Sequence, residues 1–120
     1  MSDDQSLVWG VKNGEVEVVT RGIKDMKDVN KEILNGRNAL HFAADYGQTD
    51  VIKCLIDAGA DVNKPDKYGI SPLLAAIYEG HTDAAKLLLE NGANKDGEAP
   101  DGQKYIECAE TDDMKALLKK

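Results

Sequence analysis

Apolar and polar positions along this chain return at a constant step of about 33 residues, which we call the period. One set of positions is leucine or isoleucine, and two other sets are glycine: Leu7, Leu40, Leu73 and Ile106, then Gly14, Gly47 and Gly80, then Gly36, Gly69 and Gly102. A period of this length is typical of stacked helix–turn–helix units, each of which covers an apolar face of its neighbour. Such stacks usually hold partners rather than perform chemistry, so the pattern favours a binding protein.

Each of the two middle units predicts a pair of short helices. We expect the first helices at residues 40–46 and 73–79, because Ser71 is a suitable N-cap and Pro72 suits the first helical position. Second helices are expected at 50–56 and 83–89, which begin with an aspartate and continue as an apolar stripe. Isolated helices of this length are marginal in water, so they must pack on one another.

The two end units depart from the pattern, as terminal repeats that face water should. The sequence therefore predicts an all-α solenoid with two full repeats between two capping repeats. We expect a single domain over residues 1–120, with repeats at approximately 3–35, 36–68, 69–101 and 102–120.

Composition narrows the choice of partner. The 120 residues carry a formal net charge of −7, and a nucleic-acid partner is not expected because phosphate contacts need a basic face. The charge favours a partner with a basic patch, but good solubility alone would explain it equally well. No apolar run approaches the ~20 residues that span a bilayer, so we expect no membrane partner. We expect a monomer, with self-association through the end repeats left open.

The start of the chain is polar and acidic, which indicates no secretory signal. Two cysteines, Cys54 and Cys108, lack metal-ligand spacing, and reduced thiols are the default without export. We therefore expect a cytoplasmic protein. At 13.0 kDa it is also small enough to diffuse into the nucleus.

Candidate catalytic and metal-binding residues are weak. His41 occupies a position suited to bridging loop backbone groups, and His81 follows a glycine that ends a helix. Residues 61–66 are similar to the opening of a calcium loop but lack its glycine, and Pro72 stands where its glutamate should be. The sequence predicts no enzyme, no cofactor and no metal site.

Four short segments resemble the ankyrin-repeat family. Residues 39–44 (ALHFAA) and 71–76 (SPLLAA) resemble its TPLHxA core, while residues 59–63 and 92–94 resemble its helix-end motif. The resemblance covers nearly the whole chain and implies a solenoid that binds proteins. A closer likeness, to a four-repeat member of the same length, rests on further matches at Trp9 and at residues 12–14, 43–45, 65–67, 78–81 and 100–102.

That closer likeness implies a partner, the heterodimeric actin-capping protein. The chain would occupy the capper's basic actin-binding surface and hold it away from filament barbed ends, which favours filament growth. An association with Rel-type transcription factors, also attributed to this family, is the alternative, and it would use the same surface.

Five residues are candidates for that surface. One period relates Asp45 to Tyr78 and Tyr46 to Glu79, so an aromatic and an acidic residue recur at the ends of successive helices. If the corners of the stack are aligned, these four residues form a continuous acidic ridge, although simple solvation would also explain them. Trp9, the sole tryptophan, is either a core anchor or an exposed contact. We call these five residues the contact ridge.

Overall fold

A computed structural model describes residues 3–119, with side chains from residue 5 onward. Met1, Ser2 and Lys120, which the sequence analysis assigns to the same domain, lie outside the described residues. Residues 3–119 contain eight helices and no strands apart from two isolated bridges. The helices are α1 (Asp3–Asn13), α2 (Val16–Lys24), α3 (Ala39–Asp45), α4 (Thr49–Asp57), α5 (Pro72–Tyr78), α6 (Thr82–Glu90), α7 (Tyr105–Cys108) and α8 (Asp112–Lys119).

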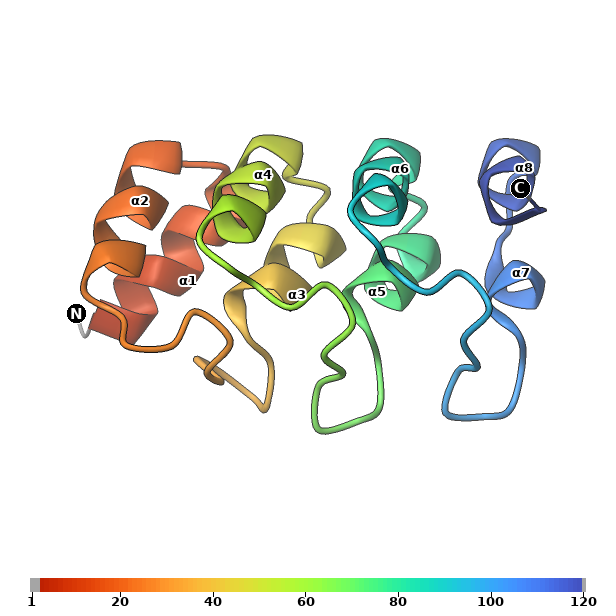
Figure 1. Cartoon of the computed structure of the whole chain (residues 1–120), viewed down its shortest axis with the longest axis horizontal. Helices are drawn as coiled ribbons and strands as arrows, with labels where there is room; N and C mark the ends of the chain where they lie inside the picture. The colour runs from red at the N-terminus through yellow and green to blue at the C-terminus, as the bar shows by residue number, and fades with distance from the viewer. Residues whose placement is uncertain (1–2, 120) are drawn as a thin grey trace.

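The helices form two parallel rows. Figure 1 shows α1, α3, α5 and α7 in one row and α2, α4, α6 and α8 in the other, with long loops projecting on the side away from the second row. Each helix packs on the next member of its own row and on its partner in the pair. The described residues measure 39 × 24 × 21 Å, as expected for a short stack. The predicted all-α solenoid is confirmed, and none of the described helices has the length and apolar character needed to cross a membrane.

Local capping determines where the first helices begin. The Asn38 side chain accepts a hydrogen bond from the His41 backbone at α3, and the Ser71 side chain accepts one from Leu74 at α5. The predicted spans 40–46 and 73–79 are therefore one residue late at each end. Tyr46 and Glu79 are the C-cap residues that follow these helices, so the ridge residues other than Trp9 lie at the helix ends.

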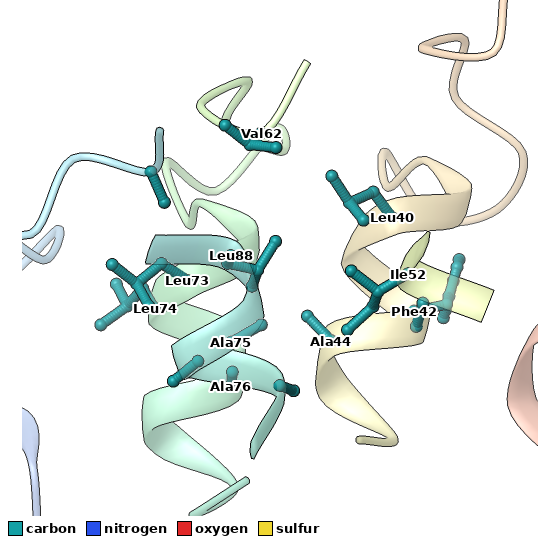
Figure 2. Packing of buried hydrophobic residues seen from close by; sticks show 14 of the residues in the cluster. Leu40, Phe42, Ala44, Ile52, Val62, Leu73, Leu74, Ala75, Ala76 and Leu88 are labelled. Atoms are coloured by element: carbon teal, nitrogen blue, oxygen red, sulfur yellow. The ribbon is translucent and has the colours of Figure 1, made fainter. Parts of the chain in front are cut away.

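Small residues let the first-row helices lie close together. Ala43, Ala44 and Ala76 are fully buried, and Ala75 is almost as inaccessible. Figure 2 shows Ala44, Ala75 and Ala76 where α3 and α5 lie side by side. Larger aliphatic side chains, including Leu55 and Leu88, fill the space between the two rows. A bulky residue at these alanines would force the helices apart, because protein cores are close-packed.

Polar bonds repeat from one helix pair to the next and fix their relative orientation. Gln48 Nε2 donates to the Lys12 carbonyl at 2.8 Å, and one period later the His81 ring bonds the Asp45 carbonyl at 3.0 Å. Gly47 makes room for that ring, since a Cβ on Gly47 would lie 2.7 Å from His81 Nδ1. The helix ends that carry the ridge are therefore held in equivalent positions.

Candidate functional site

A pocket of about 270 Å³ opens where the ends of α3 and α5 meet the loop between α4 and α5. Three ridge residues line it, namely Asp45, Tyr78 and Glu79. The rest of its lining is Arg37, Asp66, Tyr68, Ile70 and Ala75, and we call this feature the tyrosine pocket. The structure therefore brings together three of the five ridge residues, which come from two successive helices. It adds five residues that are not part of the contact ridge.

Both tyrosines of the pocket present much of their surface to solvent. Tyr68 is 56% exposed and Tyr78 is 46% exposed, whereas Phe42 and Tyr105 are buried. Burial raises the pKa of Tyr78, and the neighbouring Cys108 and Asp101 raise it further. The hydroxyl therefore stays protonated at neutral pH and can donate a hydrogen bond. Exposed tyrosines at a pocket rim are typical of surfaces that bind proteins.

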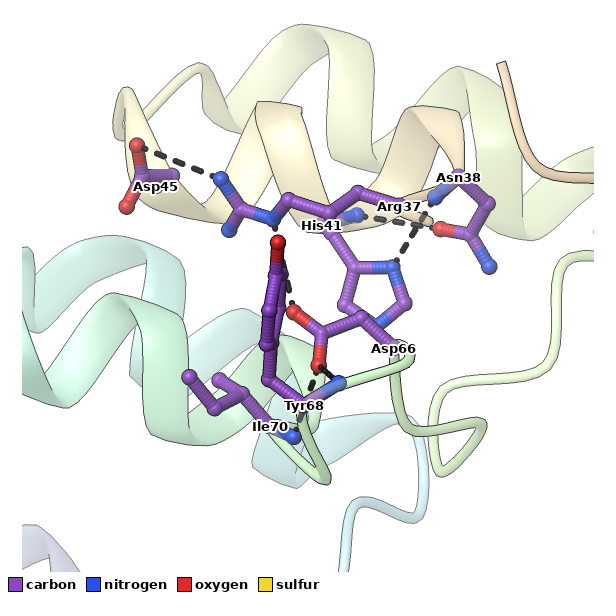
Figure 3. Close-up of polar contacts among 7 residues, drawn as sticks. All are labelled: Arg37, Asn38, His41, Asp45, Asp66, Tyr68 and Ile70. Atoms are coloured by element: carbon purple, nitrogen blue, oxygen red, sulfur yellow. Dashed lines mark hydrogen bonds and ion pairs between the residues drawn. The ribbon is translucent and has the colours of Figure 1, made fainter. Parts of the chain in front are cut away.

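Arg37 lies at the centre of the charged groups. Its Nη1 atom lies 3.8 Å from an Asp45 carboxylate oxygen, and its Nε atom lies 3.5 Å from an oxygen of Asp66 (Figure 3). The guanidinium also stands 5.0 Å from the centre of the Phe42 ring. Part of the charge of Asp45 is thus balanced within the protein. This end of the ridge is less acidic than its sequence suggests.

The Asp66 carboxylate shapes the loop that carries Tyr68. One oxygen accepts hydrogen bonds from the backbone N–H groups of Tyr68 and Ile70, at 2.8 and 2.9 Å. The other faces Arg37, and the side chain is almost fully buried. Figure 3 shows the Tyr68 ring standing beside these groups. Because a buried carboxylate with several partners is held firmly, the position of Tyr68 is determined by its own loop.

The other two ridge residues lie further toward the N-terminus. Tyr46 is 44% exposed, and the Lys12 ammonium lies 5.5 Å from its ring centre and from that of Phe42. Trp9 stands one period before Phe42 and is 51% exposed. It is therefore not the core anchor that the sequence allowed. Whether Trp9 touches a partner remains a prediction.

The two histidines have structural contacts. His41 is buried, its Nδ1 accepts a hydrogen bond from the Asn38 backbone N–H at 3.1 Å, and burial lowers its pKa.

Burial and the nearby Asp101 raise the pKa of Cys108, which keeps its thiol protonated and weakly nucleophilic. Among the described residues, no group of three or more His, Cys, Asp or Glu side chains could hold a metal ion.

Tyr68, Arg37, Asp66 and Lys12 are the site residues that the sequence did not identify. A turn glycine follows Tyr68, and an aromatic residue in a polar turn was the one available signal. Arg37 and Asp66 give no such signal, because they lie at opposite ends of one repeat and meet through packing of the loop on α3.

Comparison with known proteins gives a consistent assignment. A family model described as ankyrin repeats in three copies matches residues 7–99. The chain is 42% identical to myotrophin from Xenopus tropicalis over 52 residues. This matched segment covers 43% of this chain and 44% of that protein. It is 43% identical over 45 residues to human myotrophin, covering 38% of each. The chain therefore spans less than half the length of the curated relatives it matches.

Proposed function

The chain belongs to the ankyrin-repeat family, and from that premise we propose that it binds the heterodimeric actin-capping protein through the contact ridge and the tyrosine pocket. Ankyrin repeats bind protein partners, and stacks of this kind usually offer an extended surface rather than a reactive cleft. The similarity to the myotrophins implies the particular partner. Trp9, Asp45, Tyr46, Tyr78 and Glu79 are the proposed contact residues.

One observation supports this proposal above others. Trp9, Tyr46, Tyr68 and Tyr78 are all the aromatic side chains with large exposure among the described residues. They lie on first-row helices or at the adjoining loop, where the repeating bonds orient successive units alike. Tryptophan and tyrosine are enriched among the residues that carry binding energy in protein interfaces.

The proposed mechanism is competition for a surface. The capper's basic surface would meet the chain's aromatic residues and the carboxylates of Glu79 and its neighbours. Long-range attraction between a basic surface and a chain of net charge −7 would speed the encounter. Burial of the aromatic side chains would then slow dissociation. While bound, the capper could not reach filament barbed ends, so filaments would continue to grow.

Filament elongation measured in the presence of capping protein tests the proposal. Purified chain should restore growth from barbed ends in proportion to its concentration, and it should co-purify with the capper. Continued capping at saturating chain, together with no retention on immobilised capping protein, would reject the capper as partner. Retention of a Rel-type dimer instead would favour the alternative.

Charge reversal at Glu79 tests the proposed surface. Glu79→Lys should weaken binding to the capper and reduce its salt dependence, because Glu79 is exposed, whereas Asp45 is partly neutralised by Arg37. Glu90→Lys is the matched control, since Glu90 is an exposed residue that ends the second-row helix α6. Asp45→Lys is less clean, because the new lysine would lie beside Arg37.

Removal of the tryptophan tests the aromatic contribution. Trp9→Ala should weaken binding by ~2 kcal/mol, the usual cost of losing an interface anchor. Because half of the Trp9 surface is already exposed, the thermal unfolding midpoint should change much less than for a core truncation. A large loss of stability with unchanged affinity would place Trp9 outside the interface.

A further inference from the structure

We propose that the tyrosine pocket is a receptor for a single arginine side chain of the protein partner. This proposal rests on the proposed function in one respect only, that the partner is a protein with a basic surface. It names the chemistry that the pocket takes and a residue, Tyr68, that the contact ridge does not include.

The second repeat shows how this chain holds a guanidinium of its own. There the Arg37 guanidinium lies against the Phe42 ring, with Asp45 and Asp66 as its carboxylate partners. A planar guanidinium suits this setting because it can stack on an aromatic face and bond carboxylates in the same plane.

One repeat later, this arrangement is absent, and Tyr78 and Ala99 stand one period after the two carboxylates. Ile70 stands one period after Arg37, and Ala75 stands one period after Phe42. Both replacements line the tyrosine pocket, and Ala75 is much smaller than phenylalanine. The pocket therefore lies beside Ile70 and Ala75. In the third repeat, these residues occupy the positions that Arg37 and Phe42 occupy in the second.

The remaining walls favour a cation. Three carboxylates line the pocket, those of Asp45, Asp66 and Glu79. The guanidinium of Arg37 is the one positively charged group among the lining residues. The Lys67 ammonium stands 5.1 Å from the centre of the Tyr68 ring. Even with that ammonium counted, one negative charge is in excess. An ammonium of this protein thus already lies over the Tyr68 ring, as cations do over aromatic faces.

The occupant must enter from a partner. The pocket is open to solvent between two half-exposed tyrosines, Tyr68 and Tyr78. An arginine that projects from a basic surface could stack on a tyrosine ring and pair with Glu79 at the rim. Lysine fits less well, because its compact ammonium lacks the planar face that stacks on a ring.

Amide NMR spectra of the full chain, titrated with small probes, test the pocket without any protein partner. N-acetyl-L-arginine methylamide should shift the signals of Tyr68, Gly69, Tyr78 and Glu79 saturably, with a dissociation constant on the order of millimolar. The citrulline analogue has nearly the same shape and no charge, and it should bind at least roughly fivefold more weakly. Equal binding of the two, or shifts spread over the whole chain, would overturn the proposal. Lysine binding as tightly as arginine would overturn the choice of guanidinium.

Variants locate the site. Tyr68→Ala and Glu79→Gln should each weaken the arginine probe by roughly threefold, while Tyr68→Phe keeps the ring and should bind as the natural chain does. Glu90→Gln makes the same charge change as Glu79→Gln but lies at the end of α6, and it should have no effect. Circular dichroism melts check that each variant is folded. Unchanged affinity in both folded Tyr68→Ala and Glu79→Gln would contradict the proposed site.

Capping protein separates the failure of this proposal from failure of the proposed function. If the capper does not bind but the arginine probe shifts the pocket signals, the receptor stands and the partner is wrong. If the capper binds, Tyr68→Ala should weaken it by roughly threefold. If the capper binds Tyr68→Ala unchanged and the probe shifts nothing, the function stands and the receptor is wrong.

Discussion

The second and third helix pairs share one backbone plan but present different surfaces. Matching positions in the core keep their character, as Leu55 and Leu88 do in α4 and α6. Matching positions at the pocket do not, since Arg37 corresponds to Ile70 and Phe42 to Ala75. In the second unit Arg37 pairs with Asp45 and Asp66, whereas the third unit has no arginine at the matching position. Both units keep an apolar core against their neighbours, but the size of a core side chain can differ between them, as the buried Phe42 and Ala75 show.

Equal core roles can be tested by truncating the matched leucines. Leu55→Ala and Leu88→Ala should each lower the free energy of unfolding by about 2–5 kcal/mol, because both side chains are completely buried and leave a cavity. Urea denaturation followed by circular dichroism measures the loss. A small cost at one position beside a large cost at the other would show that the two pairs do not share a common core.

The N-caps of α3 and α5 should differ in how far their effects reach. Ser71→Ala should lower stability by about 1–2 kcal/mol through loss of the cap. It also strands the Tyr105 hydroxyl, which lies 2.8 Å from Ser71 Oγ. Asn38→Ala, at the matching position, removes only the acceptor of the His41 backbone N–H, because the Asn38 backbone still donates to the His41 ring.

A double-mutant cycle with Tyr105→Phe isolates the second contribution. The coupling between Ser71 and Tyr105 should be about 1 kcal/mol, since truncating both partners leaves no buried hydroxyl unpaired. Additive losses, with no coupling, would mean that the bond between these repeats adds nothing to stability.

The matched contacts of Gln48 and His81 should contribute similarly. Gln48→Ala and His81→Ala each remove one bond to the carbonyl of a residue 36 positions earlier, and each should cost about 1 kcal/mol in chemical denaturation. Lys53→Ala, at an exposed position of α4, is the surface control and should be close to neutral. A much larger loss for His81 alone would indicate that its ring also supports the turn at Gly47.

His41 gives the second pair a pH dependence at a position where the third pair has Leu74. Burial lowers the pKa of His41 from its ordinary 6.5, and protonation would destroy the acceptor at Nδ1. Below pH 6.5, His41 therefore binds a proton more readily in the unfolded chain than in the folded one. The His41 contribution to stability is complete above that pH and falls as the pH drops toward the folded-state pKa.

Denaturation of the natural chain and of His41→Leu at about pH 7.5 and about pH 5 measures this small effect. The natural chain should lose more stability between the two conditions than His41→Leu does. The difference of the two losses isolates His41 from the carboxylates that titrate in both proteins. Equal losses would show that His41 is not the source of the pH dependence.

Much of the fold could be read from the sequence because its signals are local and repeated. Ser71 and Pro72 mark the start of α5 through contacts within one helical turn, and the glycines that end α3 and α5 adopt positive φ angles of 67° and 72°. The C-terminal ends of α3 and α5 were predicted one residue too late. Tyr46 and Glu79 fit the helical spacing in the sequence, but in the structure they are C-cap residues.

The sequence by itself determined the period, the pairing of helices, the family and the candidate ridge, since each follows from residues at fixed spacing. Only the tertiary structure decided how charge and exposed surface are distributed over that ridge. Arg37, Asp66 and Tyr78 reach the tyrosine pocket from separate segments, brought together by packing of one repeat on the next. A repeat pattern specifies which positions are equivalent, but the neighbours of a side chain depend on how the units dock.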